Sequence, residues 1–558
     1  MKKILSKFDI VQVALLVSLL LLGGMIEVFS CVTSVILAVM LIVTAHRKGR
    51  LRLRLNLVTA TGLGIPLCHL ITCLYAVDRG MALIGFLKYL SVALFILLVE
   101  QYDETAERTI DLLPYSMLFF GVISFGLSKI PGSQFVVEER LAGFLEYPNT
   151  YAMLLLVGML AALSHDDIKL RDLLVSCGLF VLILLTGSRT TLGIAAVAVL
   201  GLLLTKKSRR VRLVTVGFIG VVAVAAVVLY MVKGDNVFLN RLFGFSFTES
   251  TFIGRLLYFY DSFKLIPYHP FGLGYLGYSY LQSGIQTGIY FNREVHNSVL
   301  QFALDIGWIP ALLFAATVVR SLFSKRLSVS RKIIIAAFFL HTLFDLDLSY
   351  PAMLCLLLIL LDNQGGKEIK LAKNTVLLIG AVGLLELYFA VHTGLWYFKL
   401  YDLADALYPY NTESKQELML ETEDIDEREA LADKILAVNS VNRPSYDVKA
   451  AAAYSRGDIE KFIEYERIVL ELAPMHDEDY PTYAYKLVAA LSAYQEAGDI
   501  SSARICAFEL IRVREELESL EDRQSELGKM IIDQPVTWFN DNLDDFIDEL
   551  ISGGVNAE

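Results

Sequence analysis

Apolar runs of about 20 residues recur through the first 395 residues of the chain, and short charged loops separate them. A run of this length can cross the hydrocarbon core of a bilayer as an α-helix. The runs fall at 9–25, 27–45, 55–77, 80–99, 112–130, 150–164, 172–187, 190–205, 211–232, 297–319, 333–349, 350–362 and 375–395. The sequence therefore predicts an all-α polytopic membrane protein with about 12 to 13 transmembrane helices.

The loops between these runs differ in charge, and this difference predicts the orientation of the chain. Basic clusters lie at 46–54, 206–212, 320–332 and 367–373. Because Lys and Arg concentrate in short cytoplasmic loops, we expect all four on the cytoplasmic side, together with the N-terminus. The same topology places the long polar loop at about 233–295 on the outer side, and an odd number of spans also leaves the C-terminus there.

The chain divides at about residue 395 into a membrane domain, 1–395, and a tail, 396–558, that is soluble in character. Most of the acidic excess behind the net charge of -11 lies in the last third, and no basic footprint for nucleic acid is visible. The stretches 451–474 and 490–513 share a frame in which a Gly-Asp pair separates two amphipathic helices. This frame resembles a tetratricopeptide hairpin, and a plain helical bundle is the alternative.

A further tail helix is expected over 533–551 to complete the stack. Its apolar residues fall on one predicted helical face: Trp538, Phe539, Leu543, Phe546, Ile547 and Leu550. We therefore predict an extracytoplasmic, repeat-like helical domain after the last transmembrane helix.

His296 ends the Gly-rich, aromatic part of the outer loop, just where an apolar run begins. We expect it in the first turn of a helix, where unpaired amides and the positive dipole end disfavour imidazolium. A neutral imidazole there can accept a proton from a sugar hydroxyl as a general base. The alternative is that His296 only caps the helix or contacts a lipid headgroup. His269, beside Pro270 in the same loop, is predicted to be structural.

Outer loops of a membrane protein are expected to contain few arginines, yet two arginines lie on the predicted outer side. Arg189 lies in the polar break TGSRTTLG, and Arg255 lies in the outer loop in TFIGRLLYFYDSF. A guanidinium at the edge of hydrocarbon usually has an anionic partner, and paired N–H donors suit a diphosphate. The alternatives are a phospholipid headgroup or a carboxylate such as Asp261.

Other polar residues are candidates for contacts with an acceptor or with the catalytic groups. His341 and Asp345 are four residues apart, which would place them on one helical face within the membrane, and an interhelical hydrogen bond is the alternative role. Asn297 follows His296, and Glu146 lies in RLAGFLEYPN, where a solvated carboxylate is the alternative. No metal-ligand spacing is visible, so we expect chemistry that needs neither a metal nor another cofactor.

In order, the chain contains GFLEYPN, SRT at a helix junction, an arginine in the outer loop, HPFGLGY and HNSVLQFALDIGWIP. Over roughly residues 10–362 this order resembles the O-antigen ligase and Wzy-type polymerase superfamily of bacterial envelopes. The resemblance implies a GT-C-type enzyme of the plasma membrane that transfers a glycan from undecaprenyl diphosphate to an acceptor hydroxyl outside the cell. It would make His296 the base and Arg189 and Arg255 the diphosphate ligands, with inversion at the anomeric centre.

The resemblance does not identify the acceptor, which could be a glycan, a lipid or a protein. Both a ligase and a polymerase are consistent with it. A non-enzymatic transporter of lipid-linked glycans is a weaker alternative, because the polar residues gather on one predicted face rather than at the midplane. A third reading makes the tail the main functional part, as a docking module for a partner protein.

Overall fold

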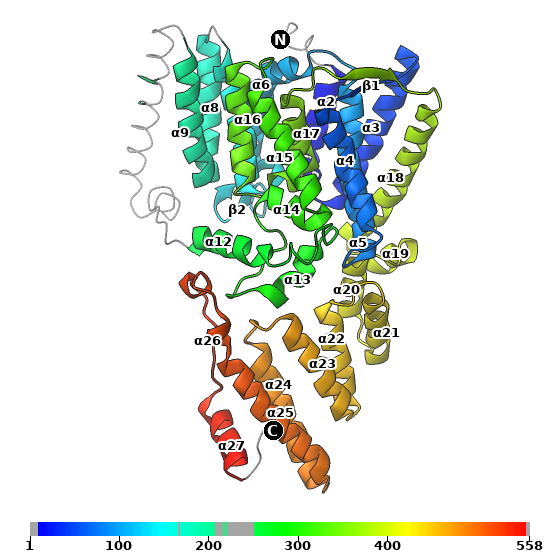
Figure 1. The fold of residues 1–558 in the computed structure, drawn as a ribbon, viewed down its shortest axis with the longest axis vertical. Helices are drawn as coiled ribbons and strands as arrows, with labels where there is room; N and C mark the ends of the chain where they lie inside the picture. The colour runs from blue at the N-terminus through cyan, green and yellow to red at the C-terminus, as the bar shows by residue number, and fades with distance from the viewer. Residues whose placement is uncertain (1–8, 166–167, 207–215, 218–219, 221–249, 554–558) are drawn as a thin grey trace. The chain divides into compact units, whose positions relative to one another are not determined.

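The computed structural model describes residues 9–165, 168–206, 216–217, 220 and 250–553 (Figure 1). The chain is 72% helical, which confirms the all-α class. It divides into two compact units, and we describe each by itself. The first unit comprises Met1–Ile71, Leu83–Ser246 and His296–Phe398, and the second comprises Thr72–Ala82, Phe247–Val295 and Lys399–Glu558.

The helices of the first part coincide with the predicted apolar runs. They are α2 (Ile10–Leu20), α3 (Glu27–Lys48), α4 (Leu57–Thr72), α5 (Arg79–Val99), α6 (Thr105–Leu127), α7 (Pro148–Ser164), α8 (Leu170–Thr186), α9 (Arg189–Thr205), α14 (Ser298–Ile306), α15 (Trp308–Phe323), α16 (Val329–Thr342), α17 (Pro351–Leu360) and α18 (Thr375–Tyr397). Within the described residues, α3, α5, α6 and α18 are long and apolar enough to cross a membrane, and shorter apolar helices accompany them. The chain is thus a polytopic membrane protein, while the predicted run at 211–232 lies mostly outside the described residues.

Burial separates the central helices of the first unit from those at its surface. All ten residues of α17 are buried, as are most of α7, so these helices are surrounded by protein on every side. By contrast, α18 exposes large apolar side chains such as Leu377 and Leu384, at 74% and 70% exposure. An apolar surface of this kind suits contact with lipid chains.

The predicted run at 297–319 is two helices, α14 and α15, rather than one. Gly307 separates them with a φ of 95° and a ψ of 158°, a conformation that is open almost only to glycine. The break leaves α14 as a short helix whose residues are nearly all buried.

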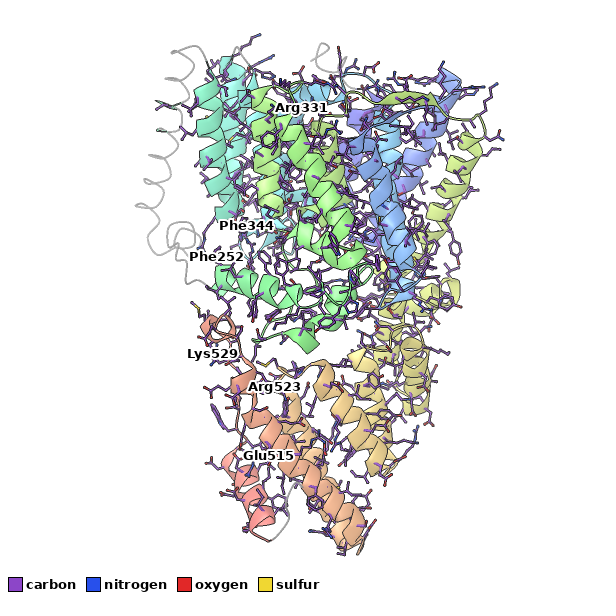
Figure 2. The ribbon with its side chains drawn as sticks, viewed as in Figure 1. Phe252, Arg331, Phe344, Glu515, Arg523 and Lys529 are labelled. Atoms are coloured by element: carbon purple, nitrogen blue, oxygen red, sulfur yellow. The ribbon has the colours of Figure 1, made fainter. Side chains whose placement is uncertain are left out.

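The first unit also contains short strands. Strands β1 (Arg52–Leu55) and β4 (Lys367–Lys370) pair antiparallel, and β2 (Val136–Val137) pairs with β3 (Arg140–Leu141). The first pair joins two of the basic loops, so these loops lie on the same side of the helices. Arg331 at the start of α16 donates hydrogen bonds to the carbonyl groups of Ile359, Leu360 and Leu361 and so caps the end of α17. Figure 2 shows Arg331 near the end of the helix bundle at which β1 and β4 pair in Figure 1.

The second unit contains the helices of the outer loop and of the tail. They are α12 (Ser250–Phe263), α13 (Gly277–Ile285), α19 (Tyr401–Leu407), α20 (Thr412–Glu421), α21 (Ile425–Leu436), α22 (Arg443–Ser455), α23 (Ile459–Leu472), α24 (Asp479–Glu496), α25 (Ile500–Glu518), α26 (Leu520–Arg523) and α27 (Asp541–Ser552). The predicted Gly-Asp turns join α22 to α23 and α24 to α25. Gly457 and Gly498 have φ values of 70° and 73°, and each following aspartate caps the next helix.

The last predicted tail helix is shorter than expected. It begins at Asp541 because Asn540 caps it, so Trp538 and Phe539 precede the helix. Phe539, Leu543 and Ile547 are buried in the tail core, whereas Trp538 is 66% exposed.

The tail contacts the outer loop within the second unit. The buried carboxylate of Asp261 on α12 accepts hydrogen bonds from the Thr287 amide at 2.9 Å and from the Tyr290 hydroxyl at 2.9 Å. The Thr287 hydroxyl bonds to Asp261 Oδ1 and Ser525 Oγ, each at 2.8 Å, and Ile531 packs against Ile253 and Leu257. The segment around residues 525–531 thus holds the helix that carries Arg255.

Replacing Gly528 with Ala is expected to loosen this attachment. A Cβ atom at Gly528 would lie 1.8 Å from the carbonyl oxygen of Thr287, and the backbone must shift to relieve that clash. We expect destabilisation of about 1–3 kcal/mol, seen as a lower midpoint of thermal unfolding in detergent. At Gly284 the nearest atom to a Cβ is 3.5 Å away, so Gly284→Ala is the control and should unfold at or above the wild-type temperature. Equal midpoints for both variants would contradict this account.

Candidate active site

The chain turns at His296 just before α14. The backbone φ of His296 is 52°, which is uncommon for a residue with a side chain and is often found at functional sites. Asn297 is the N-cap of α14, and its side-chain oxygen accepts from the amides of Val299 and Leu300 at 3.1 and 3.0 Å. The prediction that His296 lies in the first helical turn is therefore wrong, because the cap starts the helix at Ser298.

A buried carboxylate lies beside the His296 ring. The distance from His296 Nδ1 to Asp345 Oδ1 is 3.7 Å, and the His296 side chain is 20% exposed while that of Asp345 is fully buried. Asp345 Oδ1 also accepts hydrogen bonds from the Tyr147 hydroxyl at 2.8 Å and from the Leu346 amide at 3.0 Å. A carboxylate fixed in this way can orient an imidazole and stabilise the imidazolium that forms when the ring takes a proton.

The Tyr147 hydroxyl belongs to a hydrogen-bonded chain that reaches the end of α8. Asn149 Nδ2 donates to Tyr147 at 3.1 Å, and the Arg140 guanidinium donates to Asn149 Oδ1 at 2.5 Å and to the Thr186 carbonyl at 2.7 Å. Sequence reasoning missed Arg140 and Tyr147. The signal available was that both stand in RLAGFLEYPN, the polar element that also contains Glu146.

His341 is part of a second buried group, which holds the start of α9. Its Nδ1 lies 2.6 Å from Asp347 Oδ2 and its Nε2 lies 3.0 Å from the Thr191 hydroxyl. Thr191 also contacts the hydroxyl of Ser188, the N-cap residue of α9, at 2.9 Å. Since Arg189 is the first residue of that helix, this group fixes the backbone from which Arg189 projects.

The prediction that His341 and Asp345 lie on one helical face is wrong. Helix α16 ends at Thr342, so Asp345 lies in the following turn, where it faces His296 instead. The 343–349 turn nevertheless links the two groups, because Asp345 contacts His296 and Asp347 contacts His341. The Ser298 hydroxyl fastens this turn to α14 by donating to the Asp345 carbonyl at 2.9 Å and accepting from the Leu348 amide at 3.1 Å.

The remaining predicted residues occupy different places. Glu146 is partly buried, with a φ of 54°, and burial raises the pKa of its carboxyl group. Arg255 belongs to α12 of the second unit and is partly buried there. Asp261, weighed above as a partner for Arg255, accepts hydrogen bonds from Lys264, Thr287 and Tyr290.

Residues 174–315 match the family model described as O-Antigen ligase. This match supports the O-antigen ligase and Wzy-type superfamily, and we call residues 174–315 the O-antigen ligase domain. The superfamily resemblance is thereby confirmed, and members of this family are glycosyl-transfer enzymes, either ligases or polymerases. No curated protein matches the chain. The O-antigen ligase domain runs from within α8 to within α15 and contains Arg189, Arg255 and His296.

The residues that support His296 and the start of α9 lie partly outside the O-antigen ligase domain. Asp345, Asp347 and His341 follow it in the chain, and Tyr147 precedes it. Residues of the first unit on both sides of the match in the sequence thus contribute to the groups around His296 and around the start of α9.

Replacing His341 with Ala is expected to destabilise the protein strongly. The substitution leaves the Asp347 carboxylate buried without its imidazole partner, a change that typically costs about 3–5 kcal/mol. Thr191→Val removes one hydroxyl from the same group and should cost about 1–3 kcal/mol. Thermal unfolding of the purified protein in detergent measures both, and a His341→Ala midpoint equal to that of the wild type would contradict the assigned role.

Proposed function

We propose that the chain is a membrane glycosyltransferase that moves a glycan from undecaprenyl diphosphate to an acceptor hydroxyl on the outer face of the bacterial plasma membrane. The observation that carries this proposal is the His296–Asp345 arrangement at the start of α14, in which His296 belongs to the residues that match the O-antigen ligase family model. A partly exposed imidazole backed by a buried carboxylate has the chemistry of a general base.

In the proposed reaction, His296 takes the proton of the acceptor hydroxyl as the oxygen attacks the anomeric carbon. The bond from that carbon to the diphosphate oxygen breaks, so the anomeric centre is inverted in one displacement. Asp345 stabilises the imidazolium that results. The guanidinium groups of Arg189 and Arg255 bind the diphosphate and stabilise the negative charge that it gains on leaving, which lets the transfer proceed without a metal ion.

Orientation and domain roles form part of the same proposal. The N-terminus is cytoplasmic, and His296 and the helical tail lie outside the cytoplasm, where a lipid-linked donor rather than a nucleotide sugar is the glycan source. The helical hairpins of the tail, which resemble tetratricopeptide units in their Gly-Asp turns, form the surface for a protein partner.

The full-length protein in detergent tests this proposal when it is mixed with an undecaprenyl diphosphate-linked glycan and an acceptor. We expect free undecaprenyl diphosphate together with a glycan joined to the acceptor. Glycan extended on the lipid carrier instead would identify a polymerase. Absence of both products, with transport of the intact donor across proteoliposomes, would identify a carrier and contradict the proposal.

A further inference from the structure

The β1–β4 sheet presents a charged face that the proposed reaction does not use. In the register of the pair, Arg52 faces Lys370 and Arg54 faces Glu368. Because side chains alternate along a strand, these four lie on one face, and Leu53 and Ile369 lie on the other. Arg54 and Glu368 form a favourable cross-strand pair, whereas Arg52 and Lys370 are like charges directly opposite each other, an arrangement that destabilises a sheet.

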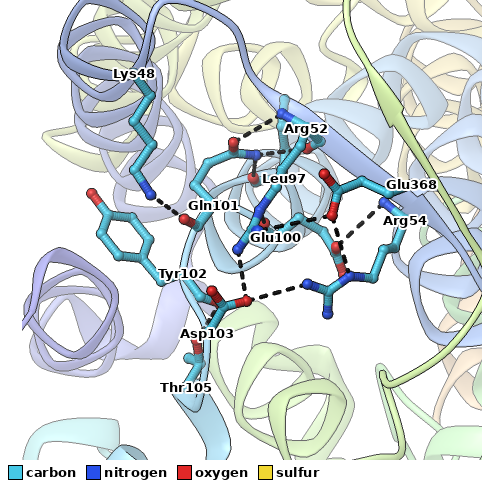
Figure 3. A network of polar contacts seen from close by, with 10 residues as sticks. All are labelled: Lys48, Arg52, Arg54, Leu97, Glu100, Gln101, Tyr102, Asp103, Thr105 and Glu368. Atoms are coloured by element: carbon cyan, nitrogen blue, oxygen red, sulfur yellow. Dashed lines mark hydrogen bonds and ion pairs between the residues drawn. The ribbon is translucent and has the colours of Figure 1, made fainter.

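Carboxylates near this face are already engaged by the two arginines (Figure 3). Asp103 lies 2.8 Å from Arg52 and 3.2 Å from Arg54, and Glu368 lies 3.8 and 3.9 Å from the same guanidinium groups. Gln101 fixes the strand by accepting from the Arg52 amide at 3.0 Å and donating to its carbonyl at 2.8 Å. The arginines are therefore held in place, and the carboxylates of Asp103 and Glu368 are occupied. A third carboxylate, that of Glu100, accepts a hydrogen bond from the Arg54 amide at 3.3 Å.

A cavity of about 660 Å³ lies beside this network. It is lined by six cationic side chains and only two carboxylates, those of Asp103 and Glu368. The six are Lys48, Arg50, Arg52, Arg108, Lys370 and Lys373. Among the described residues, Arg50, Lys370 and Lys373 form no ion pair with a carboxylate, so the cavity has an excess of positive charge.

The cavity lies at the depth where membrane-spanning helices meet water. Helix α3 ends at Lys48, α5 ends at Val99, α6 begins at Thr105 and α18 begins at Thr375, each within a few residues of a lining side chain. These four are the helices that are long and apolar enough to cross a bilayer. Phospholipid headgroups occupy this depth.

We propose that this cavity binds a phosphate-bearing anion, with the headgroup of an anionic phospholipid as its source. The anion would lie between Arg52 and Lys370 and contact Arg50 and Lys373, which relieves the like-charge pairing across the sheet. The site is separate from the His296 group: helix α17 runs from the turn that contains Asp345 toward β4. A bound anion would link the loops around residues 50 and 370, which are more than 300 residues apart in the sequence.

A titration of the full-length protein in neutral detergent tests this site, with the midpoint of thermal unfolding as the readout. The probes are short-chain phosphatidylglycerol, short-chain phosphatidylcholine and inorganic phosphate at constant ionic strength. The test variant carries Arg50→Gln, Lys370→Gln and Lys373→Gln. The control carries Arg47→Gln, Lys325→Gln and Lys367→Gln, which removes the same charge from exposed residues that do not line the cavity.

We expect phosphatidylglycerol to raise the midpoint of the wild type and of the control, and phosphatidylcholine to have no such effect. The test variant should bind phosphatidylglycerol about a hundredfold more weakly, since each cation contributes a factor of about five. An equal response to inorganic phosphate would keep the phosphate chemistry but assign a soluble source. An unchanged affinity in the test variant, an equal loss in the control or an equal effect of phosphatidylcholine would overturn the proposal.

Discussion

Replacing His296 with Ala is expected to stop glycan transfer while the protein remains folded in the membrane. Loss of a general base lowers a rate by about 10²–10⁴, and His296 is the proposed base, 3.7 Å from the Asp345 carboxylate. In the native host, surface glycan should disappear and the lipid-linked glycan should accumulate. The His296 side chain is partly exposed, and Asp345 keeps its hydrogen bonds from the Tyr147 hydroxyl and the Leu346 amide when the ring is removed, so the stability should change little.

His269→Ala is the matched control for this experiment. His269 is a partly buried histidine in the same outer loop and is predicted to be structural, and burial lowers the pKa of its ring. Cells with this variant should keep their surface glycan. Normal surface glycan in cells that contain full-length His296→Ala protein would show that another group takes the proton.

Substitution of Arg189 or Arg255 should give the second-largest loss of glycan-transfer activity. Removal of one preorganised donor that stabilises developing charge typically lowers kcat by about 10²–10³, and we expect this for Arg189→Ala and for Arg255→Ala. Lysine at either position keeps the charge but loses the planar pair of N–H donors, so it should restore activity only in part. Rates of undecaprenyl diphosphate release measure these effects.

Arg293→Lys is the control for the arginine series. Arg293 is half-exposed and lies 3.5 Å from Glu413, a surface ion pair that lysine can reproduce. The transfer activity of Arg293→Lys should equal that of the wild type. If Arg189→Ala or Arg255→Ala retained wild-type kcat and KM, the diphosphate would have to be bound by other groups.

The sequence predicted those features that depend on local pattern. A long apolar run has few alternatives to a buried helix, so the bounds of α3, α5 and α18 follow closely from hydropathy. The turns at Gly457 and Gly498 were likewise predictable, because a glycine followed by an aspartate both ends one helix and caps the next.

Features that depend on contacts between distant residues were not predictable in this way. The strand pair β1–β4 joins residues more than 300 positions apart, and neither strand is long enough to stand out in an all-helical chain. The partners of His341 and Asp345 followed from where α16 ends, since a helix shorter by a few residues moves Asp345 off the face of His341. Tyr147 reaches Asp345 only through the tertiary fold.

The central claim is that His296, Arg189 and Arg255 act on one lipid diphosphate. A structure of the full-length protein with undecaprenyl diphosphate bound tests this claim most directly. The account predicts that the guanidinium groups of Arg189 and Arg255 donate hydrogen bonds to the diphosphate, and that the His296 ring faces the end of the diphosphate that carries the glycan. A diphosphate bound out of reach of both arginines, or on the side of the helices where β1 and β4 pair, would contradict it.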